Sequence, residues 1–397
     1  MTTTAMQRSP NKDFSQFLLI GNPENRRITG FCEAAQRLGY GQPTVLSYMD
    51  LLSESPLPSL LPGTIVKIDS PGENDTVRKL LIFRGLSLHK PSYPGIQAAA
   101  NSTEVEEKGL IRHTRPWYAG YCDLLDGISR FLRGPSPLLL MNDIGDIRLA
   151  FDKPRCQSFL QQHDIPVPLL LPPVRDYDDL VTQMQQHHLS RVFIKPAHAS
   201  SASGVIAFRR MGHRVQAVTS AKMVAGAEGI QVYNSLAIQK YTREQDIARL
   251  VNRILEENAL VEEWLPKASL NDSLFDIRVL VIAGKARHMV VRMSRHPITN
   301  LHLGNKRGDL QELVARIGQQ PLLEVRALAE KTAACFPHSL YLGIDILLTS
   351  DLLRTFVLEV NAFGDLLPRL VDEGETCYEA EIRAAIRIFM HPTESND

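Results

Sequence analysis

Three side chains with hard oxygen donors lie within one apolar stretch near the end of the chain. The stretch 341–361 predicts two strands joined by a turn, with Asp345 on the first strand and Glu359 and Asn361 on the second. Because side chains alternate between the two faces of a strand, Glu359 and Asn361 point to the same side. A buried carboxylate needs a compensating cation, and oxygen ligands on neighbouring strands suit Mg²⁺. The pattern indicates either a magnesium site or acidic residues exposed at the rim of a sheet.

A lysine followed by a loop of small residues forms a second group with chemical potential. Lys195 ends the apolar strand predicted over 192–195, and the eight residues 197–204 have almost no bulk. Backbone N–H groups in such a loop can surround a phosphate. Three hydroxyls add further donors: Ser200, Ser201 and Ser203. The alternatives are a lysine that extends to the surface and a flexible hairpin that leads into the strand 205–208.

Two acids end a short strand in the middle of the chain. Glu262 and Glu263 follow Ala259–Val261 and precede Pro266. An extended segment here can offer backbone groups to the edge of a purine, with a carboxylate accepting from an amino group or from ribose hydroxyls. The alternative is an ordinary edge strand with solvated acids.

Further charges lie on the next pair of strands, predicted over 275–283 and 286–292. Asp276 and Arg278 share one face of the first strand, and Arg292 ends the second. These charges form either a structural salt bridge or part of an anion site. The loop 293–309 that follows is polar and basic, and it contains Asn300. Such a loop suits a transferring phosphate or an anionic substrate.

The elements around these groups predict an α/β protein. Short apolar strands are predicted over 17–21, 44–48, 64–68, 80–83 and 138–142, and a helix over 28–38. Strands and helices joined by short links favour a parallel, Rossmann-like sheet. Neither GxGxxG after a strand nor GxxxxGK occurs. The cluster His113–Tyr118 either lines a substrate pocket or begins a helix that packs Trp117 and Tyr118 into the core.

Composition excludes several classes of protein. The chain has 397 residues, which favours two or three packed units, and 44 basic residues balance 44 acidic ones. This balance gives no general attraction to nucleic acid. The five cysteines are scattered without a CxxC pair, which suits a reducing cytosol. No signal peptide and no apolar run of membrane-spanning length is evident, so we expect a cytoplasmic protein that does not enter a membrane.

The order of the motifs is similar to that of a known superfamily. DK precedes a helix that ends in DIPVP, and VFIKP with its small-residue loop, VEEW, DIRV and GID…LEVN follow in turn. Over residues 140–390 the chain resembles the ATP-grasp superfamily, in particular its glutathione-synthetase-like and ribosomal-protein-glutamate-ligase-like branch. The resemblance implies a Rossmann-like N-terminal domain (14–140), a lid subdomain (141–262) and a metal-binding subdomain (263–392) that clasp ATP.

The resemblance also implies a role for each matching residue. Those that would bind the nucleotide are Lys153, Lys195, Ser200, Ser201, Ser203, Gly204, Glu262, Glu263, Trp264, Leu265 and Asp276. Those that would face the transferring phosphate or the substrate are Arg278, Arg292 and Asn300. Mg²⁺, with Mn²⁺ as a substitute, would be held by Asp345, Glu359 and Asn361. The loop departs from the family pattern because only Gly204 is a glycine, which implies a stiffer lid or a specific task for His198.

The activity implied by the resemblance is an ATP-dependent carboxylate–amine ligase. ATP would phosphorylate a carboxylate, and an amine would then displace phosphate and form an amide. The substrates would be small molecules or peptides, and a homodimer is left open. Two alternatives remain: a small-molecule kinase built on the same nucleotide site, and an ATP-binding regulator without turnover.

Overall fold

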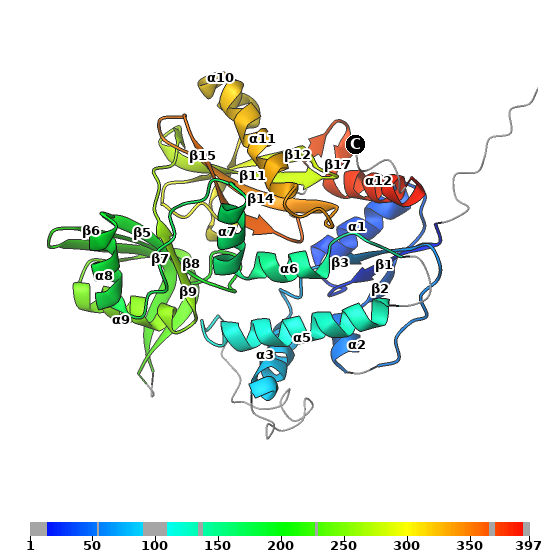
Figure 1. The fold of residues 1–397 in the computed structure, drawn as a ribbon, viewed down its shortest axis with the longest axis horizontal. Coiled ribbons are helices and arrows are strands. Elements are labelled where there is room, and N and C mark those ends of the chain that lie inside the picture. The colour runs from blue at the N-terminus through cyan, green and yellow to red at the C-terminus, as the bar shows by residue number, and fades with distance from the viewer. Residues whose placement is uncertain are drawn as a thin grey trace, which may run out of the picture.

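The computed structural model describes residues 14–53, 55–89, 109–133, 138–226, 229–364 and 370–391. Within these residues, three larger sheets follow one another along the chain, and a two-stranded sheet lies near its end. The N-terminal strands lie at one end of the molecule and the green strands β5–β9 at the other, with the C-terminal strands between them (Figure 1). No helix within the described ranges is both long and apolar enough to cross a membrane.

The N-terminal sheet is parallel, with strand order β2-β1-β3-β4. Its strands are β1 (Gln16–Ile20), β2 (Thr44–Leu46), β3 (Thr64–Ile68) and β4 (Leu138–Leu140). Its helices are α1 (Arg26–Arg37), α2 (Tyr48–Leu52), α3 (Asp75–His89) and α5 (Thr114–Leu132). The chain passes from β1 to β2 on one side and then returns to β3 on the other side of β1, and all four strands are parallel, as the sequence predicted.

The prediction of a strand over 80–83 is wrong, because these residues belong to the helix α3. Leu80, Leu81, Ile82 and Phe83 are all buried, so the run is apolar on every side. The helix α3 packs closely on α5 at two glycines: a Cβ on Gly85 would lie 1.8 Å from the oxygen of Pro116, and one on Gly120 would lie 1.9 Å from the oxygen of Leu81. A short apolar run buried on all sides cannot be distinguished from a strand by periodicity.

The central sheet is antiparallel, with order β8-β7-β6-β5-β9. Its strands are β5 (Arg191–Pro196), β6 (Ile206–Met211), β7 (Arg214–Gly226), β8 (Gly229–Tyr241) and β9 (Ala259–Glu263). The helices in this part are α6 (Ile144–Phe151), α7 (Lys153–Gln162), α8 (Tyr177–Gln186) and α9 (Glu244–Leu255). The apolar face of α9, with Ile247 and Leu250, fills a core that belongs to this sheet.

The C-terminal sheet is a second antiparallel layer, with order β13-β12-β11-β14-β15 and with β10 paired to β11. Its strands are β10 (Ser269–Leu270), β11 (Ser273–Ile282), β12 (Lys285–Ser294), β13 (Lys306–Gly308), β14 (Tyr341–Leu348) and β15 (Thr355–Asn361). Around them lie η1 (Leu301–Leu303), α10 (Leu310–Ile317), α11 (Gln320–Ala333), β16 (Val371–Asp372), β17 (Glu375–Thr376) and α12 (Cys377–Met390).

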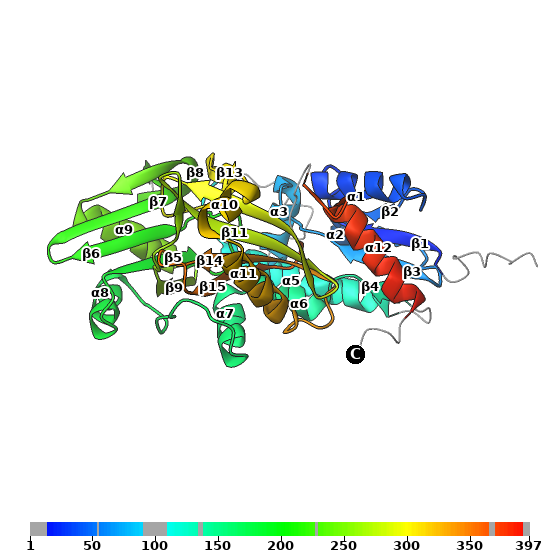
Figure 2. The ribbon, with the colours of Figure 1, turned by 90° about the horizontal axis from the view of Figure 1, so that it is seen from above.

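The N-terminal and C-terminal sheets share their cores. One apolar cluster contains Leu18 of β1 together with Phe275 of β11, and a second contains Phe17 together with Tyr378 of α12. Figure 2 shows the red helix α12 beside the N-terminal elements. These two sheets therefore form one packed body beside the central sheet, which has a core of its own and meets the C-terminal part in a small cluster of Phe193, Ala207, Ile298 and Leu303. The division of the chain at residues 140 and 262 into domains stays a prediction.

A buried ion pair crosses this shared core. The Lys67 Nζ atom lies 3.1 Å from Glu381 Oε2, and both side chains are 1% exposed. Lys67 also donates to the Tyr341 hydroxyl at the start of β14. Burial tends to lower the pKa of Lys67, but the combined effect of Glu381, Tyr341 and Asp69 outweighs burial and raises it. Through Glu381 and Tyr341, Lys67 holds β3 against both α12 and β14.

Candidate functional site

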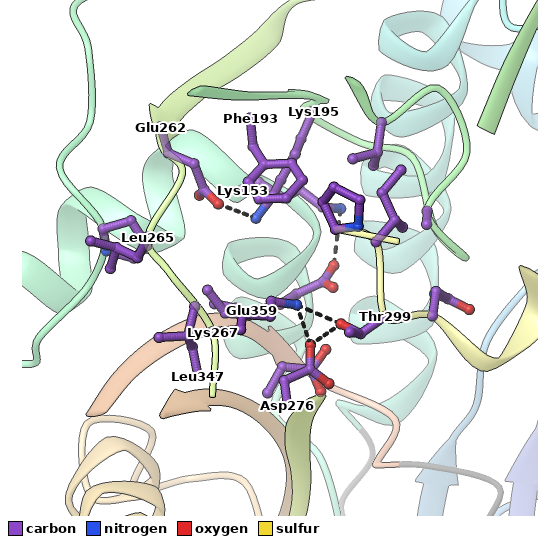
Figure 3. Close-up of a pocket in the computed structure, with 18 of the residues that line it drawn as sticks. Lys153, Phe193, Lys195, Glu262, Leu265, Lys267, Asp276, Thr299, Leu347 and Glu359 are labelled. Carbon is purple, nitrogen blue, oxygen red and sulfur yellow. Dashed lines mark hydrogen bonds and ion pairs between the residues drawn. The ribbon is translucent and has the colours of Figure 1, made fainter. Parts of the chain in front are cut away.

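A cleft between the central and C-terminal sheets contains most of the sequence-predicted residues (Figure 3). It encloses about 780 Å³, part of it open to solvent. Apolar side chains form part of its wall, among them Phe193, Leu265, Ile298, Leu347 and Leu358. The charged lining side chains are Lys153, Lys195, Glu262, Glu263, Lys267, Asp276, Arg292, Asp345 and Glu359. A cleft with an apolar wall and few, opposed charges is typical of a cofactor site.

Lys195 is held by an acid on the neighbouring strand. β5 and β9 pair antiparallel, with Lys195 opposite Leu260 and Phe193 opposite Glu262. The Lys195 ammonium forms an ion pair with Glu262, whose side chain is 1% exposed (Figure 3). Gln157 Nε2 donates to the other oxygen of Glu262 at 3.1 Å. Lys195 therefore keeps its ammonium in the cleft and does not extend to the surface.

Lys153 joins the loop of small residues to the C-terminal sheet. It begins α7, behind the N-cap Asp152, whose side chain accepts from the Arg155 N–H. Its Nζ atom donates to the carbonyl of Ala199 at 2.5 Å and lies 3.1 Å from Glu359 Oε1. The cation of Lys153 thus lies between the loop and a carboxylate of β15.

The loop of small residues has several residues with positive φ and is anchored by one histidine. Ser201, Ala202 and Gly204 have positive φ values of 54°, 57° and 71°. His198 is buried, its ring stacks on that of Tyr118 at 4.0 Å, and its Nδ1 atom lies 3.0 Å from the Phe151 carbonyl oxygen. Burial lowers the pKa of His198, which favours the neutral ring.

Tyr118 comes from the helix α5, which begins directly after His113. Trp117 on the same helix stacks on Tyr121 and packs against the apolar core. The cluster 113–118 is therefore a helix start, as in the second interpretation of the sequence. Neither Trp117 nor Tyr118 lines the cleft described above. Through Tyr118 the N-terminal part of the chain instead contacts the loop of small residues.

Alternating charges connect β11, β12 and β14. Asp276 lies opposite Arg292, and Arg278 lies opposite Asp345 in the strand register. Arg292 bridges the two acids, with Nε 2.7 Å from Asp276 Oδ1 and Nη2 3.0 Å from Asp345 Oδ2. The second oxygen of Asp276 accepts from Lys267 Nζ at 2.8 Å (Figure 3).

The pKa values follow from this arrangement. Burial would raise the pKa of Asp276, but the charges of Arg292 and Lys267 outweigh burial and lower it. Burial, together with the charges of Arg292 and Lys195, lowers the pKa of Lys267 against the opposing effect of Asp276. Three cations, Lys267, Arg278 and Arg292, face three carboxylates, Asp276, Asp345 and Glu359, so the charges of this cluster balance.

The three proposed metal ligands lie on the paired strands β14 and β15. Asp345 is opposite Glu359, and Asn361 is opposite Gly343. Asn361 Nδ2 donates to the Gly343 carbonyl at 3.3 Å, which leaves its side-chain oxygen as an acceptor. Two carboxylates and one amide oxygen are the donor set that Mg²⁺ prefers, so these residues fit the ion. Within the described ranges, no three His, Cys, Asp or Glu side chains form a metal cluster.

Comparison with known proteins identifies the family. The model of YheC/D-like ATP-grasp domains matches residues 147–365, more than half of the chain. The chain belongs to this ATP-grasp family.

Two relatives extend the comparison. The chain is 25% identical over 222 residues to coenzyme γ-F420-2:α-L-glutamate ligase from Methanocaldococcus jannaschii, a match that covers 56% of this chain and 61% of the relative. The chain thus matches less than two thirds of that protein's length. The crystal structure of D-cycloserine synthetase DcsG has a TM-score of 0.55 and 13% identity, and covers 94% of this chain and 100% of that chain. This second likeness shows the fold and confirms the predicted ATP-grasp architecture.

The ATP-grasp cleft contains most, but not all, of the predicted side chains. Those that line it are Lys153, Lys195, Ser203, Glu262, Glu263, Leu265, Asp276, Arg292, Asn300, Asp345 and Glu359. Those outside its lining are Ser200, Ser201, Gly204, Trp264, Arg278 and Asn361. Trp264 packs on Phe193, and Arg278 pairs with Asp345 behind the lining. The functional roles of both groups stay predictions.

Sequence reasoning missed several side chains of the ATP-grasp cleft. Lys267 and Thr299 both contact Asp276, and Phe193 and Leu347 form part of the apolar wall. Lys267 follows Pro266 directly, and a lysine so close to the predicted VEEW segment was a usable signal. Thr299 had no comparable signal, because its contact depends on how the loop after β12 folds back.

Proposed function

We propose that the protein is an ATP- and Mg²⁺-dependent carboxylate–amine ligase that forms an acyl phosphate and releases ADP and phosphate. The observation that supports this activity best is the buried guanidinium of Arg292, which is fixed by Asp276 and Asp345 next to the carboxylate pair of β14 and β15. Arg292 can stabilise a transferring phosphoryl group, and the carboxylate pair fits the metal ion that accompanies ATP.

The adenine ring would lie against the apolar wall of the cleft. Phe193 and Leu265 flank the opening from β5 and from the segment after β9, and Leu347 lies on β14 (Figure 3). Glu263 lines the same wall and offers a carboxylate to the ribose or to an amino group. Glu262 is already committed to Lys195 and Gln157, so its part is to hold Lys195 in place.

The phosphates would lie between the loop of small residues and the two lysines. Lys153 and Lys195 carry the charge, and Ser203 is the loop hydroxyl that lines the cleft. Asp345, Glu359 and Asn361 would hold Mg²⁺, which would offset phosphate charge when bound. Lys153 now pairs with Glu359, so binding of the nucleotide would exchange this ion pair for a contact with phosphate.

The chemistry follows from where the cations lie. A carboxylate oxygen of the acid attacks the γ-phosphorus, and ADP leaves. The amine nitrogen then attacks the carbonyl carbon and loses a proton, and phosphate leaves with the former carboxylate oxygen. Arg292 is fixed by two carboxylates, so its guanidinium can stabilise charge without reorganising. No covalent side-chain nucleophile is needed, and a buried thiol such as Cys156 has its pKa raised to about 12 by burial.

A product screen tests this activity. The purified protein is incubated with Mg²⁺, ATP and pairs of candidate acids and amines, and products are read by mass spectrometry. We expect ADP, phosphate and an amide in equal amounts, only when both acid and amine are present. A phosphorylated alcohol without amide would indicate a kinase, and ATP binding without turnover would indicate a regulator. Because the five cysteines are free thiols, we propose a cytoplasmic location and run the screen under reducing conditions.

A further inference from the structure

The turn that follows β15 lies directly on β14. Asn361 ends β15, and the Gly364 N–H donates to the Asn361 carbonyl at 3.3 Å across the turn. Gly343 of β14 lies opposite Asn361, and a Cβ atom there would lie 2.8 Å from the Gly364 carbonyl oxygen. The Asn361 side chain also donates to the Gly343 carbonyl. A displacement of this turn would therefore move Asn361, one of the three proposed ligands of Mg²⁺.

One buried amide from the N-terminal part of the chain holds the turn. Asn142 follows β4 and is fully buried. Its Nδ2 atom donates to the Ala362 carbonyl at 3.0 Å and to the Tyr341 hydroxyl at 2.6 Å, and its Oδ1 atom accepts from the Ile68 N–H at 3.2 Å. The donors and the acceptor of this amide are thus all used. Asn142 therefore joins β3 and β14 to the turn in one fixed orientation.

An arginine from α1 holds the next carbonyl of the same turn. Arg27 Nη1 donates to the Phe363 carbonyl at 2.9 Å, and Arg27 Nε lies 3.9 Å from Oδ1 of Asp69, just after β3. The Phe363 ring packs on Phe151 of α6, with 5.6 Å between the ring centroids. Two successive carbonyls of the turn therefore accept hydrogen bonds from side chains of the N-terminal part, one from α1 and one from the residue that follows β4.

These contacts begin where the support from the sheet ends. The pairing of β14 with β15 stops at Gly343 and Asn361, whereas Asp345 and Glu359 lie inside the paired region. Asn361 is therefore the proposed metal ligand that the strand pairing supports least. Residues that orient a metal ligand without touching the metal contribute strongly to its affinity. The side chains that hold the turn supply such support beyond the last strand pair.

We propose that Asn142 and Arg27 are positioning residues of the metal site, which hold the turn after β15 and thereby orient Asn361. Neither side chain lines the nucleotide cleft, so both act through the backbone of Ala362 and Phe363. The proposal rests on the Mg²⁺ site proposed above and adds the N-terminal sheet to the support of that site. Loss of either contact should weaken binding of the metal without weakening binding of the metal-free nucleotide.

The test measures metal binding directly, with Mn²⁺ as the probe. Mn²⁺ is titrated into the protein and ADP, with the protein in excess of the nucleotide, and free Mn²⁺ is read by electron paramagnetic resonance. Arg27→Met and Asn142→Ala should each raise the dissociation constant of Mn²⁺ about tenfold, as removal of a group that supports a metal ligand does. Arg27→Lys keeps a cationic donor and should retain more of the affinity than Arg27→Met. The affinity for ADP in the presence of EDTA should stay unchanged in all three variants.

Ser339→Ala is the matched control. It removes a hydrogen bond from Ser339 Oγ to Asp146 Oδ2 at 2.8 Å, which joins α6 to the segment before β14 without touching the turn, and it should leave the affinity for Mn²⁺ unchanged. Arg27 is half-buried, so Arg27→Met decides the question even if Asn142→Ala does not fold.

The outcomes separate this proposal from the metal site on which it rests. Wild-type affinity for Mn²⁺ in the variants, or an equal loss of affinity for metal-free ADP, would overturn the positioning role and leave the metal site standing. If the wild-type protein with ADP bound no Mn²⁺, the metal site itself would be refuted, and the positioning role with it. The product screen decides the ligase activity independently of both.

Discussion

Replacement of Arg292 by methionine or by lysine separates what its charge contributes to stability and turnover from what its planar shape contributes. Arg292 is buried and makes two charge-assisted contacts, at 2.7 Å to Asp276 and 3.0 Å to Asp345. Each such contact contributes about 1.5–3 kcal/mol to the free energy of unfolding. Part of what Arg292→Met loses is offset, because the variant no longer has to desolvate a guanidinium on folding. Asp276 keeps Lys267 and Asp345 keeps Arg278, so neither acid is left alone. For Arg292→Met we expect the free energy of unfolding to fall by about 2–4 kcal/mol.

Arg292→Lys is the matched variant, because it keeps the charge. A compact ammonium cannot reach both carboxylates in the way that a planar guanidinium does, so we expect an intermediate loss of stability. Mg²⁺-dependent turnover should fall about a hundred- to a thousandfold in the methionine variant, the size seen when one donor to a developing oxyanion is removed.

The assay is urea unfolding followed by tryptophan fluorescence, with turnover measured on the same samples. Arg249→Met serves as the control, since the Arg249 side chain is 59% exposed and its nearest acid is 3.9 Å away. This control should shift the free energy of unfolding by less than about 0.5 kcal/mol. If Arg292→Met were as stable and as active as the control, Arg292 would not bridge Asp276 and Asp345 and the phosphate role would fail with it.

Three further predictions concern other parts of the structure. Glu359→Ala should abolish Mg²⁺-dependent ATP turnover while the circular dichroism spectrum stays unchanged; near-normal turnover would remove Glu359 from the metal site. Lys67→Met should lower the free energy of unfolding by about 3–5 kcal/mol, because it leaves the buried Glu381 without its partner, and adding Glu381→Leu should restore part of that loss in urea unfolding. Equal stabilities of the single and double variants would contradict the pairing. Burial lowers the pKa of the His198 ring in the folded protein, so the unfolded state binds more protons as the ring titrates. The wild-type protein should therefore lose stability as the pH falls below about 6.5, the ordinary pKa of histidine. His198→Asn should weaken that pH dependence between about pH 7 and 5, and an unchanged dependence would show that another group causes it.

The sequence was most informative where local pattern and chemistry agreed. The hairpin of β14 and β15 was predicted from β-branched residues and a turn, and its acids were singled out because acids are costly in a buried strand. The parallel N-terminal strands also followed from short apolar runs between turn signals, and β3 was placed with its observed bounds. These features depend on residues close together in the chain.

Features that depend on contacts between distant residues were predicted less well. The run 80–83 is buried on every side by the packing of α3 on α5, which erases helical periodicity. The long hairpin of β7 and β8 mixes polar and apolar residues on both faces and was not predicted. Lys267 contacts Asp276, nine residues along the chain, and Thr299, 32 residues along, and the second contact could not be predicted from local sequence.

The pairing of charges was predicted in part. Asp276 and Arg278 were placed on one face with a salt bridge as one alternative, and the structure pairs Asp276 with Arg292 and Arg278 with Asp345. Strand register decides the outcome: β12 brings Arg292 opposite Asp276, and β14 brings Asp345 opposite Arg278. Register between strands that are separated by long connections cannot be derived from one sequence by periodicity alone.

Oxygen transfer from the acid substrate tests the central proposal most directly. An acid labelled with ¹⁸O in its carboxylate is incubated with its amine, Mg²⁺ and ATP, and the released phosphate is examined by mass spectrometry. Because phosphate leaves the acyl phosphate with the former carboxylate oxygen, we predict one ¹⁸O atom in each phosphate formed. Amide formation with no ¹⁸O in the phosphate would contradict the acyl-phosphate route.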